Sequence, residues 1–285
     1  MIHRNALLTY LALIFLGMGL LLIEQSRDVG KFRLIACDVG QGDGLLLISP
    51  GGKQIVVDGG PGKKILGCLS SNMPFWDHQV EMMVSTHPQK DHMEGLVAVF
   101  EKYQVGTIVT TNVPSESQLF AAWQEEIKGS GARVYVPGVG DKITLDSLNL
   151  EILWPPLAKA MEWQANAPRD LNETSIVMRA QYGDFCAYLT GDLPKEILQK
   201  IIDRPCEVLK VGHHGSKTGT DQQIVDLAGP KVALIQSGAK NQYGHPHQEV
   251  LDVLLAAGVR ILRNDLNGEV RIESDGKDFS FQSAR

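Results

Sequence analysis

The sequence predicts an α/β (α+β) protein in which two β-sheets pack against each other and carry helices on their outer faces. Short apolar or alternating runs, typical of strands, recur along the chain and are separated by turn residues and amphipathic segments. Both halves of the chain are rich in such runs, which favours two sheets within one domain. At 285 residues, with 44% hydrophobic and 21% charged residues, the composition is that of an ordinary globular protein.

The N-terminus departs from this pattern. Residues 6–23 form an uncharged apolar run that is long enough for a membrane span, so we expect an uncleaved transmembrane anchor. A cleaved signal peptide is the alternative, but the residues after the run offer no A-x-A cleavage pattern. Basic residues precede the run and favour a cytoplasmic location for residues 1–5. Residues 24–31 are then a linker, and residues 32–285 form a domain held outside the cytoplasm at the cell membrane by this single span.

The first half of the domain is expected to begin with β-structure. The strand predictions rest on apolar runs bounded by Gly, Pro, Ser or Asp, namely residues 31–37, 44–49, 53–58, 80–86, 107–111, 133–136 and 148–155. Two helices are expected between them, over residues 92–103, where Leu96, Val99, Phe100 and Tyr103 share one face, and over residues 115–128.

The second half repeats this style. Strands are expected over residues 175–183, 184–192, 206–212, 231–238, 260–264, 268–274 and 278–282. Helices are expected over residues 194–202, 220–228 and 247–257. Residues 154–170 contain three prolines and little periodicity, so we expect an irregular loop there.

Charge and cysteine content limit the classes of function. The net charge of −6 gives no global attraction to nucleic acid, so a site for a polyanion must be local. The four cysteines form no C-x-x-C pair, which argues against a thiolate zinc site. The simplest interpretation is that they are four small core residues. In an exported domain one or two disulfides can form instead, but the sequence does not fix their pairing.

Six of the eight histidines lie in three short segments, each of which follows an apolar run. They are His87 and His92, then His213 and His214, then His245 and His247. Asp91 lies beside His92, and Asp192 follows another predicted strand. A single histidine or aspartate after a strand is more often a surface or capping residue than a ligand. The recurrence of these residue types after four strands instead indicates a divalent metal site, because strand ends aim side chains into a common cleft.

The motifs that carry these residues are similar to those of a known family. They are "CDVGQGDGLLLISPGGKQIVVDGG", "STHPQKDHMEGL", "NETSIVMRAQYGDFCAYLTGD", "LKVGHHGSKTGT" and "YGHPHQEVLDVL", in this order. From about Phe32 to its end, the chain resembles metallo-β-lactamase fold hydrolases, and among them the extracytoplasmic domain of ComEC-type competence proteins. This resemblance implies a four-layer αββα sandwich.

The resemblance also implies a ligand set. Asp91, His92, Asp192 and one of His213 and His214 correspond to the ligands of one metal, with Asp91 and Asp192 in the catalytic centre as well. His87 and Asp192 correspond to residues that face a second metal. Asp58 matches the family's aspartate that orients the ligand loop.

Two positions depart from the pattern of the wider family. Gln89 stands where the second histidine of H-x-H-x-D-H belongs, and Asn172 stands where many members have a histidine facing the same metal as His87. Amides bind zinc poorly compared with imidazole. We therefore expect either one tightly held ion or a second, weaker one. Zinc or manganese is the expected cofactor, and an oxygen-rich site leaves magnesium open.

Several polar residues of the last two motifs are candidates for contact with substrate. Lys217 and His245 are expected to be catalytic through stabilisation of developing negative charge, and Ser216, Lys217, His245 and His247 to bind substrate. Lys240 is a further candidate for a phosphate contact. The glycine-rich stretch 40–44 lacks the spacing of a nucleotide cradle, so we expect a tight connection in which Asp38 or Asp43 structures the loop beneath the site.

The resulting hypothesis is a membrane-anchored, metal-dependent phosphodiesterase or nuclease that acts on extracellular DNA, in competence or in scavenging. For uptake, a separate channel protein is the expected partner, because the chain has a single apolar run of membrane-spanning length. Two alternatives remain: a non-catalytic DNA-binding or assembly module, favoured by Gln89 and Asn172, and a hydrolase of a small ester or lactam, favoured by the acidic net charge.

Overall fold

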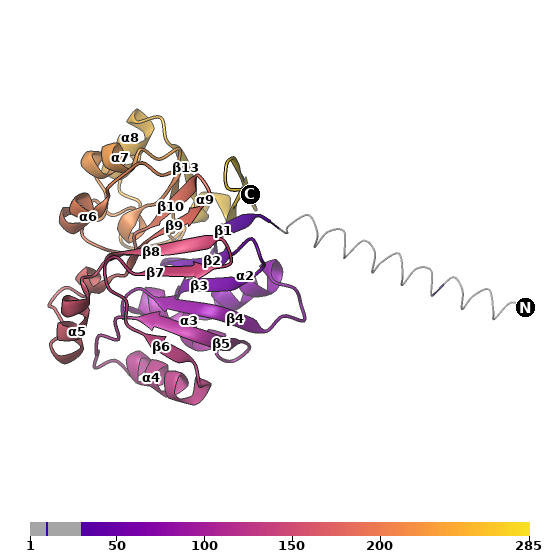
Figure 1. Ribbon diagram of the computed structural model, residues 1–285. Helices are drawn as coiled ribbons and strands as arrows, with labels where there is room; N and C mark the ends of the chain where they lie inside the picture. The colour runs from indigo at the N-terminus through magenta and orange to yellow at the C-terminus, as the bar shows by residue number, and fades with distance from the viewer. Residues whose placement is uncertain (1–9, 11–29) are drawn as a thin grey trace, which may run out of the picture.

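Two β-sheets form the centre of the molecule (Figure 1). The computed structural model describes Tyr10 and residues 30–285. The first sheet has the strand order β15-β14-β1-β2-β3-β4-β5-β6, with the bounds β15 Phe279–Ser283, β14 Val270–Ser274, β1 Phe32–Ala36, β2 Gly44–Ile48, β3 Gln54–Gly59, β4 Gln79–Ser85, β5 Gln104–Thr110 and β6 Arg133–Tyr135. The second has the order β13-β12-β11-β10-β9-β8-β7, with β13 Arg260–Arg263, β12 Val232–Ile235, β11 Val208–Lys210, β10 Phe185–Leu189, β9 Val177–Tyr182, β8 Leu148–Trp154 and β7 Lys142–Leu145.

Helices cover the outer face of each sheet. Against the first sheet pack α2 (Lys64–Asn72), α3 (Lys90–Val99) and α4 (Gln118–Ser130), and against the second pack α6 (Lys195–Ile201), α7 (Gln222–Ala228) and α8 (Gln248–Ala256). Figure 1 shows the two groups of helices with the sheets between them. The predicted arrangement of two sheets with outer helices in four layers is therefore confirmed.

Strand β1 shows why the runs in the sequence are continuously apolar rather than alternating. Leu34 and Ala36 face the second sheet, whereas Ile35 faces the helices on the other side, and all three are buried. A strand covered on both faces needs apolar residues at every position. The same requirement explains β2, in which all five residues are buried.

The direction of the strands determines at which edge of each sheet their carboxyl ends lie. Strands β1 and β3 both pair antiparallel with β2, and β3, β4 and β5 pair parallel, so these strands all end at one edge of the first sheet. In the second sheet β10, β11, β12 and β13 are parallel. The polar residues that the sequence singles out lie at the end of β3 and in the segments that follow β4, β10, β11 and β12.

The expected irregular loop over residues 154–170 is wrong in part, because α5 (Leu157–Ala165) forms within it. Only Ala160 and Trp163 of this helix are buried, so its apolar periodicity is too short to be recognised. The structure also adds α2, β7 and the single turn α9 (Asn264–Asn267), which the sequence did not predict.

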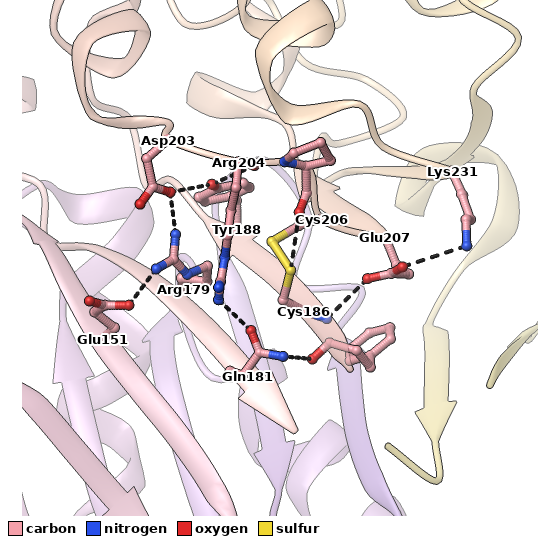
Figure 2. The surroundings of a disulfide bond; sticks show 12 residues. Glu151, Arg179, Gln181, Cys186, Tyr188, Asp203, Arg204, Cys206, Glu207 and Lys231 are labelled. Carbon is pink, nitrogen blue, oxygen red and sulfur yellow. Dashed lines mark hydrogen bonds and ion pairs between the residues drawn. A yellow bond between two sulfur atoms is a disulfide. The ribbon is translucent and has the colours of Figure 1, made fainter. Parts of the chain in front are cut away.

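Two disulfides cross-link the domain. Cys37, directly after β1, pairs with Cys68 of α2, and Cys186 of β10 pairs with Cys206, ahead of β11. Figure 2 shows the second disulfide beside Arg179, which bonds to Glu151 and Asp203. Both bonds lie within residues 32–285, which the sequence analysis expects outside the cytoplasm, and they supply the pairing that the sequence left open.

The predicted segments 1–5, 6–23 and 24–31 fall almost entirely outside the described residues. Among the residues that are described, no helix is both long and apolar enough to cross a bilayer. The anchor and the limits of the domain therefore stay predictions.

Candidate metal centre

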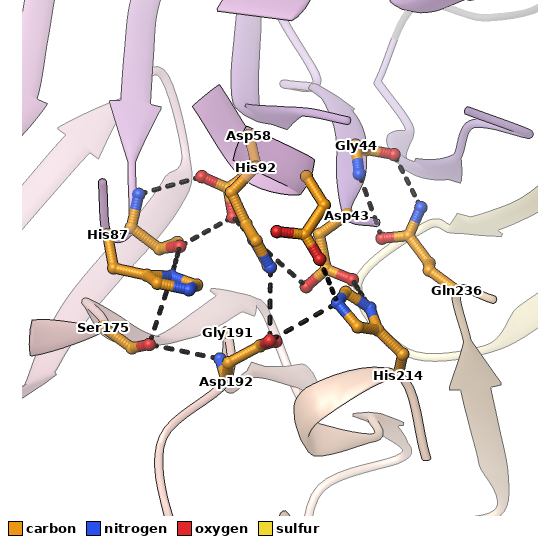
Figure 3. A network of polar contacts seen from close by, with 12 residues as sticks. Asp43, Gly44, Asp58, His87, His92, Ser175, Gly191, Asp192, His214 and Gln236 are labelled. Carbon is orange, nitrogen blue, oxygen red and sulfur yellow. Dashed lines mark hydrogen bonds and ion pairs between the residues drawn. The ribbon is translucent and has the colours of Figure 1, made fainter. Parts of the chain in front are cut away.

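The candidate centre lies at the edge where strands of both sheets end (Figure 3). Asp58 belongs to the end of β3, and His87 follows β4. From the second sheet, Asp192 follows β10, and His214 follows β11. Because parallel strands end at a common edge, residues more than a hundred positions apart meet there. Every one of these side chains is buried.

Unusual backbone conformations aim several of these residues. His213 and His214 have φ angles of 50° and 55°, and Asp58 has a φ angle of 56°. Residues other than glycine rarely adopt this left-handed backbone region, which costs about 1–3 kcal/mol for each residue. Two consecutive histidines in this conformation indicate a turn that is held in place by its surroundings, with Gly215 packed against Pro246.

The turn before β2 approaches the first turn of α3 closely. Asp43 donates its backbone N–H to the carbonyl of Asp91 at 3.1 Å. A Cβ atom at Gly42 would lie 2.1 Å from that same carbonyl oxygen, so this position requires glycine. The side chain of Gln236 accepts from the N–H of Gly44 and donates to its carbonyl oxygen, which ties the loop to the second sheet. The glycine-rich stretch is thus a tight connection, as expected, and it carries Asp43 into the centre.

Imidazole nitrogens converge on the carboxylate of Asp192. Its Oδ2 lies 3.3 Å from His92 Nε2, 3.3 Å from His214 Nε2 and 3.7 Å from His213 Nε2. His214 Nε2 also lies 3.4 Å from Asp91 Oδ2. The structure therefore brings together Asp91, His92, Asp192 and His214, with His213 at a slightly greater distance.

The second nitrogen of each buried histidine faces another carboxylate. His92 Nδ1 lies 2.8 Å from Asp58 Oδ2, and His214 Nδ1 lies 3.0 Å from Asp43 Oδ1. If these Nδ1 atoms carry the protons, both Nε2 lone pairs point at the acceptor oxygen of Asp192. Both Nε2 atoms and both oxygens of Asp192 are buried and have no hydrogen-bond partner. Acceptors that face one another in this way need either protons or a cation between them.

The donor set fits a divalent cation. Two imidazole nitrogens and one or two carboxylate oxygens match the preferences of zinc and manganese. His92 and Asp192 form such a group together with His214 and Asp43, whose candidate ligand atoms all lie within 4.8 Å of one another. His92, Asp192 and His214 would hold the ion, and Asp91 reaches it from the more exposed side.

Asp43 has a different role from the other carboxylates, because both of its oxygens already face cationic or N–H groups. Oδ1 faces His214, and Oδ2 contacts the ammonium group of Lys210. We therefore interpret Asp43 as the residue that orients His214, as Asp58 orients His92. Sequence reasoning placed Asp43 only in a loop beneath the site and missed Lys210, whose signal was a lysine within the buried strand "VLK".

The charges of the centre stabilise one another. Burial alone would lower the pKa of His92 and His214, but Asp192, with Asp58 and Asp43 respectively, raises both well above 6.5. Burial would raise the pKa of Asp192, but His214 and His92 hold it well below 3.8. His87 differs, since burial and the neighbouring His92 lower its pKa to about 3. In the metal-free protein at neutral pH, His92 and His214 are therefore cationic, and His87 is neutral.

Metal-free protein is expected to lose stability as the pH rises above neutrality. Between pH 6.5 and the raised pKa values of His92 and His214, the folded protein binds protons that the unfolded chain has released. This contribution is fully present below pH 6.5 and is lost as the pH rises through the folded pKa values. Urea unfolding in chelator, at a series of pH values, measures the effect. A transition midpoint that climbs steadily from neutral to alkaline pH would contradict it.

Gln89 and Asn172 bond to each other. Gln89 Nε2 donates to Asn172 Oδ1 at 2.8 Å, so the two amides satisfy one another beside His87. His87 Nδ1 lies 3.0 Å from Thr86 Oγ1 and 3.4 Å from Ser175 Oγ, while its Nε2 is buried without a hydrogen-bond partner. His87 thus offers one free nitrogen, but the two positions that should complete a second metal site hold a paired amide bridge.

The remaining candidate residues line the more exposed rim. His245 contacts His213 and His247, with ring centroids 5.6 and 4.9 Å apart. Lys217 is exposed and donates its backbone N–H to His247 Nδ1 at 3.0 Å. The hydroxyl of Ser216 is buried and bonds to Thr218, so it is not directed at the cluster. Tyr243, which sequence reasoning did not select, stacks on His245 and is 58% exposed.

Comparison with known proteins yields both sequence and fold relatives, although no family model matches the chain. ComE operon protein 3 of Bacillus subtilis (strain 168) is 29% identical over 82% of this chain and 32% of its own length. Competence protein ComA of Neisseria gonorrhoeae is 30% identical over 44% of this chain and 18% of its own length. The chain thus spans about a third, or less, of these relatives.

Solved structures resemble the chain in fold. The metallo-β-lactamase fold protein YhfI from Bacillus subtilis has a TM-score of 0.54 and 12% identity, covering 81% of this chain and 96% of that one. Zinc-bound PqqB from Methylobacterium extorquens has a TM-score of 0.51 and 13% identity, covering 78% of this chain and 85% of that one. At such identities the likeness concerns the two sheets and their outer helices.

Proposed function

Because this chain has the metallo-β-lactamase fold and is similar in sequence to competence proteins, we propose that it is a metal-dependent hydrolase that cleaves DNA outside the cytoplasm. The observation that carries the proposal is the convergence of two buried imidazole nitrogens, His92 Nε2 and His214 Nε2, on Asp192 Oδ2, each at 3.3 Å. Without a metal ion, both buried imidazoles must be protonated to face this single carboxylate, whereas a divalent cation between them is bound by both nitrogen lone pairs and the carboxylate at once.

The residues around the centre have separable roles. When bound, a divalent cation would supply an activated water and would neutralise charge on a phosphoryl oxygen. Asp91, more exposed than Asp192, is held as a carboxylate because His214 and His92 lower its pKa. His245 stays neutral at pH 7, since burial and the neighbouring histidines lower its pKa to about 4. It can therefore accept a proton at the rim, and the exposed ammonium group of Lys217 can balance the charge of a phosphate.

A polynucleotide fits the rim better than a small ester does. His213, His245, His247 and Lys217 lie together, and the exposed ring of Tyr243 stacks on His245. The ammonium group of Lys217 can pair with a phosphate, neutral imidazoles can hydrogen bond to its oxygens, and an exposed aromatic ring offers a surface on which a base can stack. These groups would bind nucleic acid locally, on a molecule whose net charge of −6 gives no general attraction to it.

An extracytoplasmic position is part of the proposal. The two disulfides are of the kind that persists in oxidising compartments. The apolar run 6–23 would anchor the domain to the cell membrane, in line with the similarity to competence proteins. The chain spans 32% of the length of ComE operon protein 3. A role in DNA uptake would add a channel protein as a partner, whereas scavenging would not.

The test is turnover by the full chain in detergent. Protein dialysed against chelator and reloaded with zinc or manganese is expected to degrade DNA, and protein kept in chelator is not. Single- and double-stranded substrates are compared side by side, together with a lactam and a lactone. Hydrolysis of the lactam or the lactone without any cleavage of DNA would contradict the nuclease proposal and indicate a small-molecule hydrolase.

A non-catalytic DNA-binding or assembly module is the second candidate. The hydrogen bond between Gln89 and Asn172 favours it, because it replaces ligands that other members of the family use. This candidate predicts DNA binding without turnover under every metal condition, and binding that the loss of Asp91 leaves unchanged.

One tightly bound ion per chain is expected, and the amide pair provides a way to test this number. The variant Gln89→His/Asn172→His would supply two imidazoles beside the free nitrogen of His87. Elemental analysis after dialysis should then rise from about one to about two zinc ions per chain. The matched variant Gln89→Ala/Asn172→Ala, which supplies no ligand, should remain at one ion. An unaltered count in the double-histidine variant would show that these positions do not shape a second site.

A further inference from the structure

Two aromatic side chains project from the loop between α2 and β4. Phe75 is 81% exposed and Trp76 is 53% exposed. Their rings pack edge to face with centroids 4.7 Å apart. Exposed side chains of this size are costly in water, and two adjacent ones on a loop tip form a small apolar projection. We call Phe75 and Trp76 the aromatic tip.

The aromatic tip lies at the sheet edge opposite the candidate metal centre. It precedes β4, next to Asp77, which accepts a hydrogen bond from Gln54 at the start of β3. Strands β1, β3 and β4 run parallel, so the tip and the start of β1 share one edge. Figure 1 shows the described chain entering β1 on the same side of the sheets as α2.

The chain also sets how far the aromatic tip can be from a membrane. Eight residues, 24–31, separate the apolar run 6–23 from the start of β1. Fully extended, they reach about 28 Å. Three strand spacings separate β1 from β4, which is about 14 Å along the sheet edge. Because β1 starts at this edge, an anchored body is tethered more closely at this edge than at the opposite edge, which holds the metal centre.

We propose that Phe75 and Trp76 insert into the interface of the bilayer that holds the anchor, and so fix the body with its metal centre turned away from the membrane. This inference depends on the anchor in the proposed function. Tryptophan favours the boundary between lipid and water, where its ring is amphipathic. A protein partner fits less well, because two side chains offer far less than the roughly 800 Å² per partner of a stable interface.

Insertion of aromatic rings does not require a charged headgroup. Lys31 and Lys53, on the same edge, lie 3.5 Å from Glu273 and 3.2 Å from Asp146, so their charges are partly balanced within the protein. The contact should therefore form on zwitterionic lipid.

Fluorescence quenching in vesicles tests the inference. The full chain is reconstituted into phosphatidylcholine vesicles brominated near the headgroup. Of its four tryptophans, Trp123 and Trp163 are buried, and Trp154 is partly buried. The wild type is expected to be quenched, and Trp76→Phe to lose most of that quenching. Unchanged DNA turnover of Trp76→Phe in detergent shows that the fold is intact.

A matched variant places a tryptophan at the other edge. Trp76→Phe/Tyr243→Trp carries an exposed ring beside His245, which should remain unquenched. Vesicle flotation of the same samples separates the two proposals. If the chain floats but the wild type is no more quenched than Trp76→Phe, the inference fails and the anchor stands. If the chain does not float with the vesicles, both the anchor and the inference fail, while turnover in detergent still reports on the metal centre.

Discussion

Replacement of Asp192 by asparagine is expected to lower kcat/KM for DNA cleavage about 10³-fold and to release the bound ion. Asp192 is buried, and both of its oxygens lack hydrogen-bond partners, while two imidazole nitrogens lie 3.3 Å from one of them. An amide keeps the shape but removes the negative charge that a cation needs between these histidines. Steady-state kinetics and elemental analysis of the same preparation measure the two losses.

The control for this variant is Asp38→Asn. Asp38 lies in the loop after β1, is paired with Arg285 and makes no contact with the histidines. It should keep both its metal content and its turnover. Full metal content and activity in Asp192→Asn would show that the centre does not work through this carboxylate.

Replacement of Lys210 by methionine is expected to destabilise the protein by about 3–5 kcal/mol, because it leaves the buried carboxylate of Asp43 with a single partner. Lys210 is 1% exposed and Asp43 is 3% exposed, and the two are in direct contact. The pKa of Asp43, which burial would raise, is held below 3.8 by Lys210 and His214. Urea unfolding of the metal-free proteins measures the loss.

A double-mutant cycle separates the ion pair from general damage to the core. Lys210→Met/Asp43→Leu removes both charges and should recover part of the lost stability, since no unpaired charge remains. It should nevertheless bind metal more weakly, because Asp43 no longer orients His214. Lys231→Met is the comparison, as its lysine is exposed and pairs with Glu207, and its effect should stay within about 0.5 kcal/mol. If the double variant is as unstable as Lys210→Met, charge pairing is not the cause.

Most strands were predictable from sequence because both faces of the sheets are covered, whereas β7, which is mostly exposed, was not. Residues such as those of β2 are apolar at every position and end in glycine, serine or aspartate. Helix α2 escaped prediction because it is short and carries Gly67 and a run of serines at its end. Helix α5 escaped because two prolines precede it and only two of its residues are buried.

The centre was predictable where its residues directly follow strands. His87, Asp192 and His214 each come just after an apolar run, and the structure brings them to one edge. Lys210 could not be recognised in this way, because it sits inside a strand and its role depends on Asp43, 167 positions earlier in the chain. Contacts between the two sheets are a property of the fold and leave no local pattern.

The departures at Gln89 and Asn172 were visible in the sequence, but their relation to each other was not. The sequence predicts two weakened ligand positions, whereas the structure shows one amide pair joined at 2.8 Å. A change at either residue alone would therefore break a hydrogen bond before it could create a ligand, which is why the double substitution is the informative one.

Each β-sheet contributes half of the candidate centre. His92 follows β4 of the first sheet, and Asp192 and His214 follow β10 and β11 of the second. An ion held there would be bound by residues from both sheets and would link the two halves of the fold. The halves could then separate only by ejecting it, so bound metal would add RT ln(1 + [M]/Kd) to the free energy of unfolding and tighten the cooperativity of the whole transition. Such a protein would be most vulnerable to proteolysis before it first binds its ion.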